Sequence, residues 1–319
     1  MVKRLSLDNI SKFYALVAAE YTVYSPSQKG GLVSLEPKKY FDRYSLFKFQ
    51  TIMPPKKVLL ENVYDLESNP KEQKLAFFGI HLCDVKAIAT MDRIFAKDPF
   101  YRAKRDDSLI VATGCQPTES CFCHVFGANK HQGFDLFIQE EHDGMFTVFA
   151  KSAKGVELLQ KSKGKILMSA SYQPIGQNQN EIDLSELTDA VENRRLFEQH
   201  WQGIANNCFG CGACTAVCPL CFCFDTIDRT DPEGGNCHRS RTDDACFFAN
   251  FSKISNHDFR PENVDRLYNW YHHKFVRGPK ENGDFLCVGC GRCITACPAN
   301  LNIIRILSAI DNVFDRATN

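Results

Sequence analysis

The 319-residue sequence lacks the features that mark several common classes of protein. Its 38 Lys and Arg residues are balanced by 38 Asp and Glu, so we expect no basic surface for a nucleic acid or an anionic membrane. The longest apolar stretch, at 75–82, is far shorter than the roughly 18 residues of a membrane span. The first ten residues, MVKRLSLDNI, contain neither an apolar core nor a cleavage site, so no signal peptide is expected.

The loops with which proteins bind nucleotides are also missing. No G-x-G-x-x-G sequence opens a helix after a strand pattern, and no Walker A lysine loop occurs. The nine histidines form no arrangement typical of acid–base catalysis. We therefore predict that the chain catalyses nothing by itself, and that any flavin or nicotinamide is bound by another subunit.

Cysteine, in contrast, is abundant, with 16 residues in a chain that has only two Trp. Cysteine-rich chains are usually secreted disulfide proteins or metal proteins. Because no secretion signal is visible, we expect a cytoplasmic protein whose thiols stay reduced. The cysteines are therefore interpreted as ligands.

One cysteine motif occurs twice. The spacing Cys-x2-Cys-x2-Cys-x3-Cys-Pro runs from Cys208 to Pro219 and again from Cys287 to Pro298. It is the signature of ferredoxins with two [4Fe–4S] clusters, in which the fourth cysteine of each run binds the other cluster. The ligands predicted for one cluster are Cys208, Cys211, Cys214 and Cys297. Those predicted for the second cluster are Cys218, Cys287, Cys290 and Cys293.

A zinc-stabilised scaffold is the alternative from a different class of function. A zinc ribbon uses two Cys-x2-Cys knuckles and four ligands for each metal. It would leave the later cysteines of each motif and both prolines without a role. The two interpretations differ in colour, because a zinc protein is colourless whereas a cluster protein is brown and is bleached by dithionite.

The first half of the sequence has the pattern of an α/β domain. Two continuous apolar runs, at 75–80 and 109–113, are typical of strands buried on both faces. Between them, residues 84–95 have helical spacing, with Asp84 placed as an N-cap. Strand, helix and strand in this order predict a βαβ unit with parallel strands.

Four smaller elements are predicted from local patterns. A helix is expected over 8–21 with Asp8 as its cap, and a hairpin is expected to turn at 142–144. A helical pattern covers 183–202, and a further helix is expected over 261–275.

The whole chain is predicted to be an α+β protein of two domains, 1–175 and 176–319. The boundary is set by the polar segment 171–181, whose Pro and Gly are typical of a linker. The second domain is predicted to be helical and ferredoxin-like. It contains two cluster motifs, 208–225 and 285–304, and a long insertion between them, 226–284.

Four cysteines of the first half predict a third iron–sulfur cluster. Cys83 and Cys115 each follow one of the two predicted parallel strands, whose carboxyl ends meet at one sheet edge. Cys121 and Cys123 lie on the loop that continues from that edge, and four converging thiols can hold a cluster. Buried, inert thiols are the alternative. The unassigned cysteines that could replace a member of this set are Cys221, Cys223 and Cys246.

From about Phe77 to Leu301 the sequence resembles one family, which comprises the iron–sulfur subunit of anaerobic sulfite reductase and the β subunit of soluble sulfhydrogenases. The resemblance rests on five cysteine-bearing segments: 79–85 (GIHLCDV), 115–123, 208–226, 244–246 and 287–299. The two ferredoxin motifs alone are generic, whereas the Cys-x-Cys pair at 221–223 and the cysteine signature ahead of the linker are specific features of the family. The sequence departs from the family at 124–127, lacks a tryptophan just before Cys246, and has an additional Cys237, interpreted as an ordinary thiol.

The resemblance implies an electron-transfer role in an anaerobic oxidoreductase complex. Members of this family accept electrons from a flavin- and NAD(P)H-binding subunit. They pass them to a catalytic subunit with sirohaem, nickel–iron or a disulfide-reducing centre. A carrier linked to a heterodisulfide reductase is the alternative within this class, because the residues do not distinguish the terminal subunit.

Overall fold

The computed structural model describes residues 1–29, 32–60, 62–63, 65–66, 68–168, 172, 182–230 and 237–318, with the backbone alone from 311 onward. The chain forms two compact units and passes between them more than once. The first comprises 1–59, 70–118 and 127–177, and the second comprises 60–69, 119–126 and 178–319. The linker predicted at 171–181 lies, apart from Tyr172, outside the described residues.

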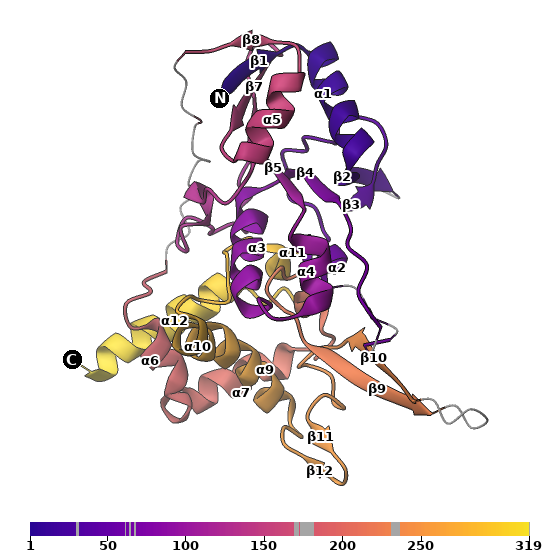
Figure 1. The fold of residues 1–319 in the computed structure, drawn as a ribbon. Helices are drawn as coiled ribbons and strands as arrows, with labels where there is room; N and C mark the ends of the chain where they lie inside the picture. The colour runs from indigo at the N-terminus through magenta and orange to yellow at the C-terminus, as the bar shows by residue number, and fades with distance from the viewer. Residues whose placement is uncertain are drawn as a thin grey trace. The chain divides into compact units, whose positions relative to one another are not determined.

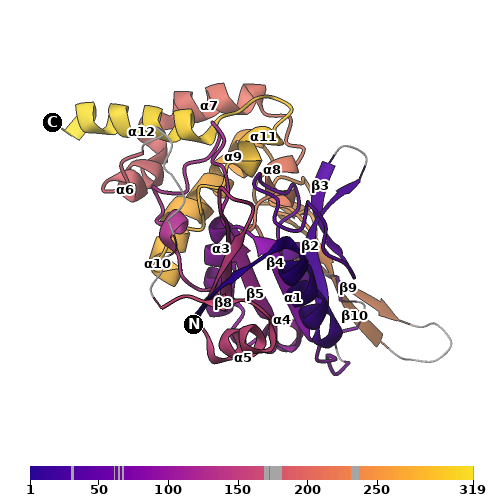
Figure 2. The ribbon, with the colours of Figure 1, turned by 90° about the horizontal axis from the view of Figure 1, so that it is seen from above.

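A single sheet forms the centre of the first unit, with the strand order β3-β2-β4-β5-β6-β7-β1-β8 (Figure 1). Its strands are β1 (Val2–Leu5), β2 (Thr22–Lys29), β3 (Leu32–Pro37), β4 (Leu75–Ile80), β5 (Leu109–Thr113), β6 (Leu136–Glu140), β7 (Phe146–Ala150) and β8 (Lys165–Ile166). The four central strands from β2 to β6 run parallel, and the outer strands pair antiparallel. Figure 2 shows β2, β4 and β5 side by side in a second view.

Helices cover this sheet and confirm the predicted βαβ unit. They are α1 (Leu7–Glu20), α2 (Lys56–Leu59), α3 (Leu82–Ile94), α4 (Pro99–Arg105), the 3-10 helix η1 (Ala128–Lys130) and α5 (Ala153–Lys161). β4 and β5 are parallel, every residue of both is buried, and α3 and α4 lie between them in sequence. On one face, Phe13 of α1 and Leu158 of α5 pack with Phe78 and Val111 in one core.

Two predicted helix caps are wrong. The N-cap of α1 is Ser6, whose Oγ accepts a hydrogen bond from the Asn9 backbone N–H at 3.3 Å, and Asp8 lies in the first turn. The N-cap of α3 is His81, and Asp84 again lies in the first turn, where it is buried. A carboxylate in the first turn is favoured by the helix dipole, so the same residue type suits both positions. The predicted hairpin is confirmed, since β6 and β7 pair antiparallel across 141–145.

The second unit is mainly helical. Its helices are α6 (Leu187–Glu192), the 3-10 helix η2 (Arg194–Phe197), α7 (Glu198–Asn207), α8 (Ala213–Ala216), α9 (Asn263–His272), the π-helix η3 (His273–Arg277), α10 (Gly278–Asn282), α11 (Arg292–Thr295) and α12 (Ile303–Thr318). Two short ribbons are formed by β9 (Phe224–Thr230) with β10 (Cys237–Asp243), and by β11 (Lys253–Ile254) with β12 (His257–Asp258). The helix predicted over 183–202 is therefore three pieces, whereas the helix predicted over 261–275 is confirmed as α9 and the turn after it.

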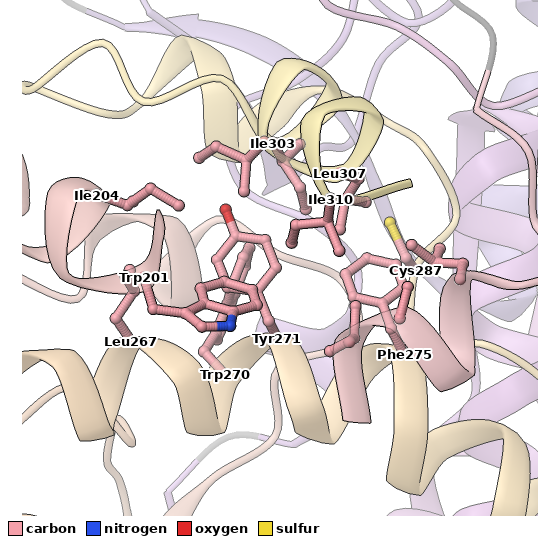
Figure 3. Packing of buried hydrophobic residues seen from close by; sticks show 14 of the residues in the cluster. Trp201, Ile204, Leu267, Trp270, Tyr271, Phe275, Cys287, Ile303, Leu307 and Ile310 are labelled. Atoms are coloured by element: carbon pink, nitrogen blue, oxygen red, sulfur yellow. The ribbon is translucent and has the colours of Figure 1, made fainter. Parts of the chain in front are cut away.

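One apolar core holds these helices together (Figure 3). Trp201 of α7 is fully buried, and its ring centroid lies 5.1 Å from that of Tyr271 on α9. Phe275, Leu307 and Ile310 continue the same core. Burying aromatic side chains of this size contributes about 2–3 kcal/mol each. The core therefore holds α7, α9 and α12 together. The first cysteine motif follows α7, and the second lies between α9 and α12.

Candidate iron–sulfur sites

The first cysteine motif begins where α7 ends. Cys208 is the C-cap of α7, and Gly210 and Gly212 both have positive φ, 63° and 71°. These left-handed residues turn the backbone tightly, so the Gly210 N–H reaches the Cys208 Sγ at 3.4 Å. Gly212 is also the N-cap of α8, the single turn that carries Cys214.

The second motif repeats this geometry. Gly289 and Gly291 have φ of 64° and 78°, and Gly291 is the N-cap of α11, which carries Cys293. The Gly289 N–H lies 3.4 Å from the Cys287 Sγ, matching the bond in the first motif. The repeated sequence thus folds into two equivalent loops, and α8 and α11 contact each other.

The eight motif cysteines line two cavities of the second unit. The cysteines of the first cavity are Cys208, Cys211, Cys214, Cys293 and Cys297. Those of the second cavity are Cys218, Cys287, Cys290 and Cys293. The fourth cysteine of each motif lies with the first three of the other, and Cys293 lines both cavities. This grouping is the one that crossed ligation requires.

The walls of these cavities suit a cluster better than a single ion. Among the described residues, no three or more His, Cys, Asp or Glu side chains converge closely enough to hold one metal ion. The thiols instead surround an apolar space, to which Trp270 and Ile303 contribute in both cavities. Low polarity and a spread of sulfur ligands are what an iron–sulfur cube needs.

Burial also affects the protonation of these thiols. Burial raises the pKa of Cys214 to about 12 and that of Cys287 to about 12. As free thiols they would stay protonated and inert at neutral pH. To hold a cluster, these cysteines would have to lose their protons, because thiolate is the form that coordinates iron. All 16 cysteines lie in the described ranges, and none of them forms a disulfide there.

Loop residues 119–126 lie along the second motif within the same unit. The Phe122 N–H donates to the Gly289 carbonyl at 2.8 Å, and the Cys121 thiol lies 3.7 Å from the Cys290 carbonyl oxygen. A Cβ added to Gly289 would stand 2.4 Å from the Phe122 carbonyl oxygen. Only glycine therefore fits where the two segments meet.

The four cysteines predicted to hold a third cluster fall in both units. Cys83, in the first turn of α3, and Cys115, after β5, belong to the first unit and follow parallel strands as expected. Cys121 and Cys123 belong to the second unit. Burial, followed by the nearby sulfur of Cys121, raises the pKa of Cys123 to about 12. This ligand set stays a prediction.

The remaining cysteines also differ in their surroundings. A hydrogen bond with Cys223, together with burial and the neighbouring Cys221, raises the pKa of Cys246 far above its ordinary value. The Asp244 N–H donates to the Cys223 carbonyl at 3.2 Å, which keeps the two segments together. Cys237 begins β10 and is exposed, as an ordinary surface thiol would be.

One residue beside the second cavity was not singled out by the sequence. Lys274 is 2% exposed, and its Nζ donates to the Cys218 Sγ at 3.2 Å. Its only signal in the sequence is its position as the charged member of an aromatic segment, WYHHKF. A lysine in such a segment usually extends its ammonium to solvent, so its burial could not be predicted.

Comparison with known proteins agrees with this geometry. Residues 207–301 match the family model described as a 4Fe-4S dicluster domain. Over 333 aligned residues the chain is 28% identical to "Sulfhydrogenase 2 subunit beta" of Pyrococcus furiosus, covering 96% of this chain and 97% of the relative. In the part of the chain that the structure describes, no helix is both long and apolar enough to cross a bilayer.

Proposed function

Since this chain belongs to a family of iron–sulfur subunits with a 4Fe-4S dicluster domain, we propose that it relays electrons between two other subunits of a cytoplasmic oxidoreductase complex. When bound, [4Fe–4S] clusters accept and release single electrons. The chain's own residues would hold these clusters, shield them from water and set their potentials. A zinc-stabilised scaffold is the alternative, and it predicts a colourless protein that dithionite does not bleach.

The observation that carries this proposal is the sorting of the motif cysteines into two cavities. We propose that Cys208, Cys211, Cys214 and Cys297 hold the first cluster. The proposed ligands of the second are Cys218, Cys287, Cys290 and Cys293. Apolar side chains on the cavity walls would exclude solvent, and the loop N–H groups would donate to ligand sulfur.

The proposed partners follow from the relative and from what the sequence lacks. The relative is named as one component of a sulfhydrogenase, so a nickel–iron catalytic subunit is one proposed partner. A flavoprotein that binds NAD(P)H is the other. A sulfite-reducing sirohaem subunit or a heterodisulfide-reducing subunit remains an alternative terminal partner. Anaerobic purification of the tagged chain from its own cells, with identification of the accompanying subunits, decides among them.

The chain alone is expected to oxidise neither NADH nor NADPH. Its sequence contains no nucleotide-binding loop, so electrons from these donors need a flavoprotein to reach it. The measurement is anaerobic bleaching of the brown absorbance after addition of NAD(P)H, with and without the co-purified flavoprotein. Dithionite serves as the positive control. Bleaching by NAD(P)H in the absence of any flavoprotein would contradict the prediction.

The iron content of the chain is expected to show whether a third cluster is bound. Two clusters correspond to about eight irons per chain, and a third raises the number to about twelve. We propose Cys83, Cys115, Cys121 and Cys123 as its ligands. In a chain that binds about twelve irons, Cys83→Ser should lower the content to about eight, while Cys237→Ser should not change it. A Cys223→Ser variant that loses four irons, with Cys83→Ser unchanged, would mean that Cys223 takes the place of Cys83 in the ligand set.

A further inference from the structure

Lys274 is a buried cation with an unusual set of neighbours. It lies on the π-helical turn η3, at 2% exposure, and its Nζ donates to the Leu286 carbonyl at 2.8 Å as well as to the Cys218 Sγ. The same nitrogen lies 5.2 Å from the centre of the Trp270 ring, within range of a cation–π interaction. Burying an ammonium group costs several kcal/mol unless other groups compensate it. The burial of Lys274 therefore requires a stabilising neighbour.

The group that compensates the buried ammonium of Lys274 is a cysteine sulfur. In the described part of the chain, no carboxylate forms an ion pair with Lys274. Its Nζ instead lies 3.2 Å from the Cys218 Sγ, and Lys274 lines the second cavity together with Cys218, Cys287 and Cys290. A lysine that donates to a proposed ligand sulfur is placed to act on the centre that this sulfur would bind.

The backbone around Lys274 is also specialised. α9 ends at His272 and the chain continues as a π-helix over His273–Arg277, a widened turn that often marks functional sites. The Leu286 N–H returns a bond to the Lys274 carbonyl at 3.0 Å. This two-way pairing ties the lysine to the residue before Cys287, at the start of the second motif.

We propose that Lys274 is a positioning residue that raises the reduction potential of the cluster in the second cavity above that of the first. This inference rests on the proposed function, which assigns Cys218 to that cluster. Reduction adds a negative charge to a buried centre, and burial alone would oppose it. An ammonium donor on the ligand sulfur stabilises the added charge, as hydrogen bonds to sulfur do in iron–sulfur proteins.

The two cavities differ in this respect. In the second, Cys287 and Cys290 are buried, which opposes reduction, and Lys274 supplies a cation in contact with a ligand that more than offsets this burial. In the first, Cys211 is exposed. Electrostatic attraction falls with distance, so Lys274 acts most on the cluster bound by Cys218 and less on the one bound by Cys214. On this proposal, the second cluster would be reduced before the first at equilibrium.

The test uses the full chain, reconstituted anaerobically and titrated with reductant while EPR spectra are recorded. Lys274→Met is expected to disfavour reduction of one cluster by about tenfold or more, which is about 59 mV for a one-electron couple. The other potential should move much less. Lys280→Met is the matched control, since it removes a lysine that is exposed and paired with Glu192, and it should move neither potential.

Two further variants keep the result interpretable. Lys274→Arg retains the charge and should restore most of the potential, and Lys274→Gln retains a donor alone and should restore less. Equal shifts of both clusters, or unchanged potentials in both Met and Gln variants that contain all their iron, would overturn the inference. A wild-type chain that shows no pair of [4Fe–4S] signals would instead refute the proposed function.

Discussion

Replacement of Cys297 by serine is expected to remove the cluster whose other ligands are Cys208, Cys211 and Cys214, although Cys297 belongs to the second motif. The reason is that Cys297 lines the first cavity. Loss of one cube lowers the iron content by about four atoms per chain. Iron analysis and EPR of the reduced, reconstituted protein provide the measurement.

Comparison among four variants identifies which cluster is lost. The spectrum of Cys297→Ser should match that of Cys208→Ser, and the spectrum of Cys218→Ser should match that of Cys287→Ser. Cys237→Ser, at an exposed position outside both motifs, is the control and should retain all its iron. If Cys297→Ser instead matched Cys287→Ser, each motif would hold its own cluster and crossed ligation would be wrong.

Replacement of Gly289 by alanine is expected to abolish the second cluster and to destabilise the second unit by about 3 kcal/mol. Its φ of 64° is unfavourable for alanine, and the new Cβ would lie 2.4 Å from the Phe122 carbonyl oxygen and 2.5 Å from its carbon. Left-handed strain costs about 1–2 kcal/mol and forced displacement of packed backbone about as much again. Iron content and thermal unfolding followed by circular dichroism measure the two effects.

Gly283→Ala separates the two causes. Gly283 has a similar φ of 70°, but a Cβ there would meet no atom within 4 Å. This variant should lose about 1 kcal/mol and keep its iron. Equal behaviour of the two variants would mean that the contact between Gly289 and Phe122 has no part in holding the second motif.

The sequence predicts the local parts of this structure well and the long-range parts poorly. The apolar runs that form β4 and β5, and the helix between them, are encoded within about 40 residues, and all three are present. The motif spacing likewise predicts two tight loops, because three cysteines at two-residue intervals need backbone turns that glycine permits. The ends of helices were less predictable, since a carboxylate is favoured at the N-cap and in the first turn alike.

Contacts between distant segments left no pattern in the sequence. The Phe122 N–H finds its acceptor at Gly289, far along the chain, and nothing near Phe122 indicates it. Lys274 is similar, because its sulfur partner Cys218 is 56 residues away. The predicted boundary at 175/176 and the third ligand set both depend on such contacts, and both stay predictions.

The interleaved path of the chain has a consequence for its synthesis. Residues 60–69 and 119–126 belong to the second unit, yet they leave the ribosome before most of that unit exists. At about 5–20 residues per second, roughly ten to thirty seconds separate the emergence of Phe122 from that of Gly289. During that interval the loop at 119–126, with two of its thiols, has no partner loop to pack on. We expect the second cluster to be inserted in the cell only after the second motif has been synthesised, and a fragment that starts after residue 175 would lack part of its own fold.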